Sequence, residues 1–181
     1  MPAASPLFGL PKYESVRVTA PDGSRQYETP MGRVPSVTTV LSGSRDNSAI
    51  EQWRNAVGAE RADEITEAAC WRGDRHHENI ENLLLNGVEP KLNMVTMKYW
   101  KSTADFLTTI RHPVLCEGAV WHPEKFAGAF DCLAFLDDDD DQPTLCDWKT
   151  ADRPRKPDKL YEYKLQVAAY RAALNFVYAK Q

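Results

Sequence analysis

The sequence has no uninterrupted apolar run that approaches the roughly 20 residues needed to cross a bilayer. Its opening stretch, MPAASPLFGLPK, shows neither the apolar core of a signal peptide nor the Arg-rich amphipathic pattern of a transit peptide. Cysteine is scarce, with four in 181 residues, and no two have the spacing of a CxxC metal-binding pair. These absences argue against a membrane protein and a disulfide scaffold, so we expect a cytoplasmic protein with reduced cysteines.

A positive net charge, which DNA-binding proteins commonly carry, is also missing. The formal charge is −4, but the run 137–141 supplies five of the 26 acidic residues, and without it 22 basic residues face 21 acidic ones. We interpret this run as a solvated loop. Basic residues gather further on, at Arg153, Arg155, Lys156, Lys159 and Lys164. Because local potential matters more than net charge, they are candidate DNA contacts; the alternative is a solvated basic loop.

Three short apolar runs, 114–121, 128–136 and 144–150, have the length and composition of β-strands. Asp131 interrupts the second run, and Asp147 and Lys149 interrupt the third. Because strand side chains alternate in direction, Asp147 and Lys149 should share one face. If the second and third runs form a hairpin, Asp131 comes to lie beside them.

Charged side chains in such strands are costly unless they are paired or bind a metal. A divalent cation between Asp131 and Asp147 would also remove their mutual repulsion, and Lys149 could then face a water or an anion held there. Oxygen ligands suit Mg²⁺ or Mn²⁺, and such ions promote phosphodiester hydrolysis. The alternative is a structural Asp–Lys pair with Asp131 elsewhere.

Gln166 and Tyr170 lie four residues apart on the helix predicted after these strands, so they share one helical face. Together the candidates form the pattern D…DxK…QxxxY. With the stretches GAFDCLA, LCDWKTADRPRKP and LQVAAYRAALN, this pattern resembles the RecB-type branch of the PD-(D/E)xK nucleases. It is similar in particular to the family of the mitochondrial genome maintenance exonuclease and its phage and bacterial relatives. Phe130 stands where the superfamily name has proline.

The resemblance extends to the stretch RGDRHHENIE, which contains Arg72, His77 and Glu81. It implies that His77, Asp131, Asp147 and the Trp148 carbonyl bind the metal and that Arg72 contacts DNA. An isolated histidine is otherwise more often structural. His76 is displaced by one position and should point toward solvent or a neighbouring helix.

The resemblance also assigns catalytic roles. Lys149 would act on the attacking water, and Gln166 and Tyr170 would orient Lys149 and the DNA backbone. Glu117 matches a family glutamate that is a metal ligand or a partner of Lys149; a surface or ion-pair role is the alternative. Some RecB-type relatives hold an iron–sulfur cluster with three cysteines beyond the QxxxY helix. No cysteine follows Tyr170 here, so the resemblance implies no iron–sulfur cluster.

The resemblance therefore implies a metal-dependent DNA exonuclease that acts on single-stranded ends and leaves 5′-phosphates. Replication or recombination proteins are the expected partners, in a bacterial or phage setting. Two alternatives remain, a structure-specific endonuclease on the same core and a catalytically silent DNA-binding or recombination partner protein.

We expect one nuclease domain over residues 1–181 with a restriction-endonuclease-like α/β fold, in which helices flank a small mixed sheet. Residues 1–47 hold an irregular lead and a hairpin around PDGS, 48–112 are helical, and 113–181 form the catalytic core. Ser48 and Glu51 suggest a capping box, and Gly87 a helix end. Tyr99 and Trp100 are assigned to the core, with base stacking as the alternative.

Overall fold

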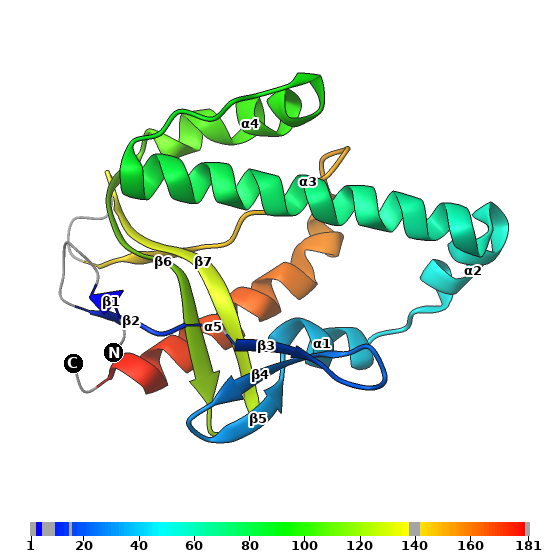
Figure 1. Ribbon diagram of the computed structural model, residues 1–181, viewed down its shortest axis with the longest axis horizontal. Coiled ribbons are helices and arrows are strands. Elements are labelled where there is room, and N and C mark those ends of the chain that lie inside the picture. Colours follow the sequence, from blue (N-terminus) through cyan, green and yellow to red (C-terminus); the bar gives the residue numbers. More distant parts are fainter. Residues whose placement is uncertain (1–2, 5–9, 15, 138–141, 180–181) are drawn as a thin grey trace.

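The computed structural model describes residues 3–4, 10–14, 16–137 and 142–179 (Figure 1). The N-terminal part contains strands β1 (Ala3–Ala4), β2 (Pro11–Lys12), β3 (Val16–Thr19), β4 (Arg25–Thr29) and β5 (Gly32–Pro35). Four helices follow, α1 (Val37–Gly43), α2 (Ser48–Val57), α3 (Ala59–Asn86) and α4 (Met94–Leu107). The last part contains β6 (Ile110–His122), β7 (Phe126–Leu136), β8 (Thr144–Cys146), the 3₁₀ turn η1 (Pro157–Leu160) and α5 (Tyr161–Tyr178). None of the described helices is long and apolar enough to cross a membrane.

The central sheet has the strand order β6-β7-β8, and both of its strand pairs are antiparallel. The predicted α/β class is confirmed. The sheet was expected to be mixed, whereas the parallel contact that the described residues make is an isolated bridge between Ser36 and Ala127. The expected loop at 137–141 falls mostly outside the described residues. The hairpin of the second and third runs is nevertheless present as β7 and β8.

The strand boundaries differ from the predicted ones at both ends of the sheet. Strand β6 begins at Ile110, and Pro113 lies within it, next to a shift in register between Pro113 and Leu115. Proline is tolerated there because a residue at an irregularity need not donate to the ladder. Strand β8 ends at Cys146, so Asp147 and Lys149 follow the strand instead of belonging to it.

Helices cover both faces of the central sheet. Val120 and Phe130 pack with Tyr170 of α5 in one buried cluster, while Cys132 packs with Ile80 of α3 in another. Figure 1 shows α3 and α4 stacked along one side of β6 and β7, with α5 running across the other side. Residues two apart on a strand normally face the same way, so the change of cluster between Phe130 and Cys132 shows that the alternation of side chains along β7 breaks near Asp131, although the strand itself is continuous.

The N-terminal sheet, with the order β3-β4-β5, packs against the start of β7. The hairpin predicted around PDGS is confirmed as β3 and β4. Tyr27 and Val34 of this sheet are buried against Ala127 of β7. Ser36 then caps α1, since its side chain accepts a hydrogen bond from the Thr39 amide at 2.9 Å. The bridge between Ser36 and Ala127 and the packing on Ala127 hold the N-terminal sheet beside the central one.

The helix end predicted at Gly87 is confirmed, and the side-chain cap predicted at Ser48 is not. Gly87 ends α3 in a left-handed conformation, as expected. The capping box assigned to Ser48 and Glu51 is wrong, because Ser48 is the first residue of α2 and its hydroxyl donates to Asp46 at 3.0 Å. A capping box does occur at Asn93 at the start of α4.

Three of the cysteines lie side by side in the sheet as buried free thiols. Cys116, Cys132 and Cys146 occupy paired positions on β6, β7 and β8. The Sγ atoms of Cys116 and Cys132 are 3.7 Å apart, and this contact together with burial raises the pKa of Cys132. The prediction that these three cysteines are buried within the strands is confirmed. As protonated apolar groups they pack against α3.

Helix α5 approaches the sheet closely at Gly128 of β7. A Cβ atom built on Gly128 would lie 2.5 Å from the Tyr170 ring. Tyr170 is buried and belongs to the main cluster of the core, so its ring has little room to retreat. The absence of a side chain at Gly128 therefore sets the distance between α5 and β7.

We predict that Gly128→Ala lowers the free energy of unfolding by about 1–3 kcal/mol, because overpacking forces the ring or the helix to move. Gly43→Ala is the matched control, since a Cβ there meets nothing within 4 Å. Urea denaturation followed by circular dichroism measures both variants. Equal stability of the two would show that α5 does not depend on this contact.

Candidate active site

Asp131 on β7 and Glu117 on β6 lie opposite each other in the central sheet, in the register fixed by the neighbouring pair Cys116 and Cys132. Like charges at opposed positions of an antiparallel pair repel and destabilise it. Glu117 also has a φ of 51°, in the left-handed region that non-glycine residues seldom occupy. Strain of this kind collects at functional sites, where surrounding contacts hold it in place.

His77 of α3 lies against both carboxylates. Its Nδ1 is 3.3 Å from Asp131 Oδ1 and 3.7 Å from Glu117 Oε1. Its Nε2 is 3.1 Å from the Trp148 carbonyl oxygen, which can only accept, so Nε2 carries a hydrogen. Burial alone would lower the pKa of His77, but hydrogen bonds and charges from Asp131 and Glu117 outweigh it and raise the pKa to about 10. The imidazolium supplies the positive charge that the carboxylates require.

The same three residues could hold a metal ion. One ligand atom from each of His77, Glu117 and Asp131 lies within 4.8 Å of the other two. One nitrogen and two carboxylate oxygens suit a divalent cation such as Mn²⁺ or Mg²⁺. The Trp148 carbonyl holds the imidazole so that Nδ1 faces the carboxylates, which is the usual way of orienting a histidine ligand. The nitrogen Nδ1 of His77 and the oxygens of Glu117 and Asp131 could bind a divalent cation, which would replace the proton on Nδ1.

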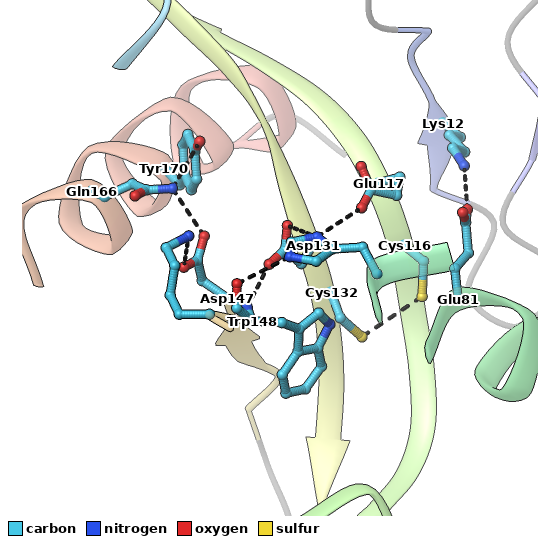
Figure 2. Close-up of polar contacts among 12 residues, drawn as sticks. Lys12, Glu81, Cys116, Glu117, Asp131, Cys132, Asp147, Trp148, Gln166 and Tyr170 are labelled. Carbon is cyan, nitrogen blue, oxygen red and sulfur yellow. Dashed lines mark hydrogen bonds and ion pairs between the residues drawn. The ribbon is translucent and has the colours of Figure 1, made fainter. Parts of the chain in front are cut away.

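Asp131 also binds the segment that follows β8. Its Oδ2 accepts a hydrogen bond from the Trp148 amide at 2.5 Å, so its two oxygens are divided between His77 and Trp148. Asp131 is buried, with 8% of its surface exposed. Figure 2 shows Asp131 at the centre of the group, between Glu117 and Trp148.

Asp147 and Lys149 form the second half of the site. Lys149 Nζ makes an ion pair with Asp147 Oδ2. Gln166 Nε2 donates to Asp147 Oδ1 at 3.0 Å and lies 3.2 Å from the Tyr170 hydroxyl (Figure 2). Burial and the charge of Asp131 raise the pKa of Asp147, while Lys149 acts in the opposite direction. Gln166 thus contacts Asp147 and Tyr170 contacts Gln166, where an interaction of both with Lys149 was expected.

One polar cleft of about 380 Å³ gathers the site residues predicted from the D…DxK…QxxxY pattern. Its lining includes His77, Glu117, Asp131, Asp147, Lys149, Gln166 and Tyr170. Trp148 is not among the lining residues, but its backbone carbonyl and amide bind His77 and Asp131. The candidates therefore converge from α3, β6, β7, α5 and the segment after β8.

His76 and His77 are divided between two environments. His76 is buried against α4, where its Nε2 lies 3.1 Å from Thr103 Oγ1 and its ring meets the edge of Trp100. Burial and the neighbouring His77 lower the pKa of His76. His76 therefore packs against a neighbouring helix, one of the two environments expected for it.

A second, larger hollow begins at Asp147 and Lys149 and continues away from the cleft. This groove has a volume of about 930 Å³ and runs between α4, α5 and the loop after Lys149. Its rim carries the predicted DNA contacts Arg153 and Arg155. Lys156 is exposed on the same loop but does not line the groove, and the Lys159 side chain falls outside the described residues.

Arg72 is placed differently from the other candidate DNA contacts. Its guanidinium lies 5.9 Å from the centre of the Tyr99 ring and 3.9 Å from Asp152. Asp152 also accepts hydrogen bonds from Lys98 Nζ and the Tyr99 hydroxyl, each at 2.6 Å, and these contacts lower its pKa to about 2. Sequence analysis missed Asp152, because no periodic pattern marks a loop residue that ties α4 to the segment after β8. Tyr99 is buried, as the core assignment predicted.

The family model of the PD-(D/E)XK nuclease superfamily matches residues 37–180. The chain belongs to this superfamily. A search of curated proteins gave no match. PD-(D/E)XK nucleases use divalent metals, and the group of His77, Glu117 and Asp131 could hold one. Membership supports nuclease activity that depends on a metal, with DNA as the substrate.

We predict that metal binding releases a proton from His77. Its raised pKa keeps the imidazole protonated at neutral pH, and Nδ1 must lose that proton before it can bind a cation. Affinity should therefore fall as the pH falls, by up to about tenfold per pH unit below the His77 pKa. Calorimetric titration with Mn²⁺ in buffers of different ionisation enthalpy measures the released protons.

His77→Ala should abolish this release, and His112→Ala, which removes an exposed histidine, should leave it unchanged. Proton release that persists in His77→Ala would mean that another group titrates with the metal.

Proposed function

We propose that the protein is an exonuclease of the RecB-type branch that hydrolyses DNA from single-stranded ends. The observation that carries this proposal is the convergence of Asp131, the Asp147–Lys149 pair and the Gln166–Tyr170 pair in one cleft. These residues are spread over 40 positions of the chain and line the same cleft. The likeness to the mitochondrial genome maintenance exonuclease and its phage and bacterial relatives belongs to the same proposal.

Metal binding is assigned to His77, Glu117 and Asp131, whose donor atoms already lie together. Asp147 is a further candidate ligand. The Trp148 carbonyl, expected as a ligand, accepts from Nε2 of His77 and so orients that ligand from the side of the ring away from the carboxylates. A divalent cation held there would lower the pKa of a bound water and neutralise charge that develops on the phosphoryl group. The identity of the ion is proposed as Mg²⁺ or Mn²⁺ from the mixture of oxygen and nitrogen donors.

Lys149 is the proposed group that acts on the water and on the developing charge. Its Nζ pairs with Asp147 and lies 5.7 Å from the centre of the Tyr163 ring, at the junction of the cleft and the groove. Gln166 holds Asp147, so it positions Lys149 through that carboxylate. Attack by water on phosphorus would break the bond to the 3′-oxygen and leave a 5′-phosphate.

The preference for single strands rests on the groove beside Lys149. Its lining is mostly apolar and includes Leu160, Tyr163 and Val167, while Arg153 and Arg155 lie on its rim. Unpaired bases bind to apolar or aromatic surfaces by stacking, and the phosphates of the same strand bind to cationic side chains beside that surface. A base pair hides the faces and edges that such a groove would contact. The groove thus favours an unpaired strand.

We propose that the whole chain, residues 1–181, works as one nuclease unit. Its free thiols suit a reducing compartment such as the cytoplasm. Proteins of replication or recombination, which produce single-stranded ends, are the partners proposed for it.

We predict that Lys149→Ala reduces cleavage at least about 100-fold, because the variant loses a charge that acts in the transition state. Binding of a single-stranded oligonucleotide in EDTA should change much less, since other cations supply most phosphate contacts. Lys91→Ala, at an exposed position outside the cleft and the groove, is the control. Cleavage by Lys149→Ala within about tenfold of the wild type would rule out this role.

We predict that end-labelled linear single strands are degraded while circular single strands of the same sequence persist. A strand without ends offers no entry to an exonuclease, whereas an endonuclease cuts it. A time course with Mg²⁺ or Mn²⁺, followed on denaturing gels, measures both substrates. Cutting of the circle at a comparable rate would identify a structure-specific endonuclease.

A further inference from the structure

Two arginines of the N-terminal sheet face the candidate active site from outside the catalytic core. Arg17 on β3 pairs with Tyr27, and Arg25 on β4 pairs with Thr19. Because alternate residues of a strand share a face, Arg17 and Arg25 lie on the face that carries Tyr27. Tyr27 packs against Ala127 of β7, so this face looks toward the central sheet.

Both arginines line the polar cleft of about 380 Å³ together with Asp131 and Lys149. Arg25 also lines an adjoining hollow of about 560 Å³, which shares Lys149 and Gln166 with the cleft. The two guanidinium groups therefore form a wall across from the residues that would hold and hydrolyse a phosphodiester. We call Arg17 and Arg25 the arginine wall.

Within the described part of the chain, neither guanidinium has an ion pair or a side-chain hydrogen bond. Every other arginine as far as residue 75 pairs with a carboxylate, and the pairs join Arg33 to Glu28, Arg45 to Glu162, Arg54 to Asp63, Arg61 to Glu64, Arg72 to Asp152 and Arg75 to Glu78. The arginine wall keeps its donors available although Asp74, Glu78 and Glu81 line the same cleft. Free guanidinium donors in a cleft suit a ligand that brings its own acceptors.

The backbone of Arg25 is held firmly although its side chain is exposed. Its carbonyl oxygen accepts hydrogen bonds from the Ser36 amide and from Thr39 Oγ1, both at 2.9 Å. These contacts tie the start of β4 to the start of α1. A fixed backbone lowers the entropy lost when the side chain binds a ligand.

We propose that the arginine wall binds non-bridging oxygens of the substrate's phosphates and holds the backbone against Lys149. The acidic residues of the cleft would otherwise repel a polyanion, and two guanidinium forks offset that repulsion with paired hydrogen bonds to phosphate. The N-terminal sheet is thus part of the substrate-binding surface. The proposal relies on the proposed function for the identity of the anion as a nucleic acid backbone.

The test measures binding apart from catalysis. Fluorescence anisotropy in EDTA gives the Kd of a labelled single-stranded oligonucleotide at several salt concentrations. The double variant Arg17→Ala/Arg25→Ala should bind about tenfold or more weakly, and its salt slope should fall by about 0.7 for each arginine removed. Arg33→Ala is the matched control, because Arg33 belongs to the same sheet but pairs with Glu28 and does not line the cleft. It should bind within about twofold of the wild type.

Arg17→Lys/Arg25→Lys separates charge from geometry. This variant should keep the salt slope but still bind more weakly than the wild type, since an ammonium cannot form the bidentate contact. With metal present, the double alanine variant should raise KM far more than it lowers kcat. A thermal unfolding midpoint equal to that of the wild type verifies, for each variant, that the sheet is intact.

An unchanged Kd and salt slope in the folded double alanine variant would overturn the proposal, even if the wild type cleaves DNA. Conversely, binding that depends on both arginines in a protein that never cleaves would support the arginine wall and refute the nuclease proposal. The two proposals therefore fail separately.

Discussion

The repulsion between two carboxylates at one cross-strand position is the constraint on which the site depends. Glu117 and Asp131 face each other across β6 and β7, and neither can pair with the other. Their charge is balanced by His77, so the middle of α3 must lie against this point of the sheet. The left-handed backbone of Glu117 is the local cost of turning both carboxylates toward that helix.

The second constraint is the approach of α5 to β7. With only a hydrogen at Gly128, the Tyr170 ring reaches the strand, and the same helix brings Gln166 to Asp147. Asp147 lies just after the end of β8, so sheet hydrogen bonds do not fix its position. A helix packed in the core therefore takes over the support that a strand would otherwise provide.

Much of the site could be predicted from the sequence because its residues break local patterns. Asp131 in an apolar run and the i, i+4 spacing of Gln166 and Tyr170 are visible without a structure. The grouping of Glu117 with His77 was left open, since it depends on the register of β6 and on a left-handed backbone that nothing in the local sequence requires. Arg17, Arg25 and Asp152 were missed because only tertiary packing brings a hairpin and a loop to the cleft and the groove. The strand ends were misjudged for the same reason, as hydrogen-bond partners and not composition decide where β6 begins and β8 stops.

The segment after β8 contacts three helices within a few residues. Trp148 reaches His77 of α3, Asp147 reaches Gln166 of α5, and Asp152 reaches Tyr99 of α4. These helices are distant along the chain, so a chain that is still being synthesised, or has folded in part, carries the acidic and basic groups of the site scattered in solution. The site and the groove beside it are therefore complete only when all three helices contact this segment, so a copy in which one of them is unfolded lacks part of the assembled site.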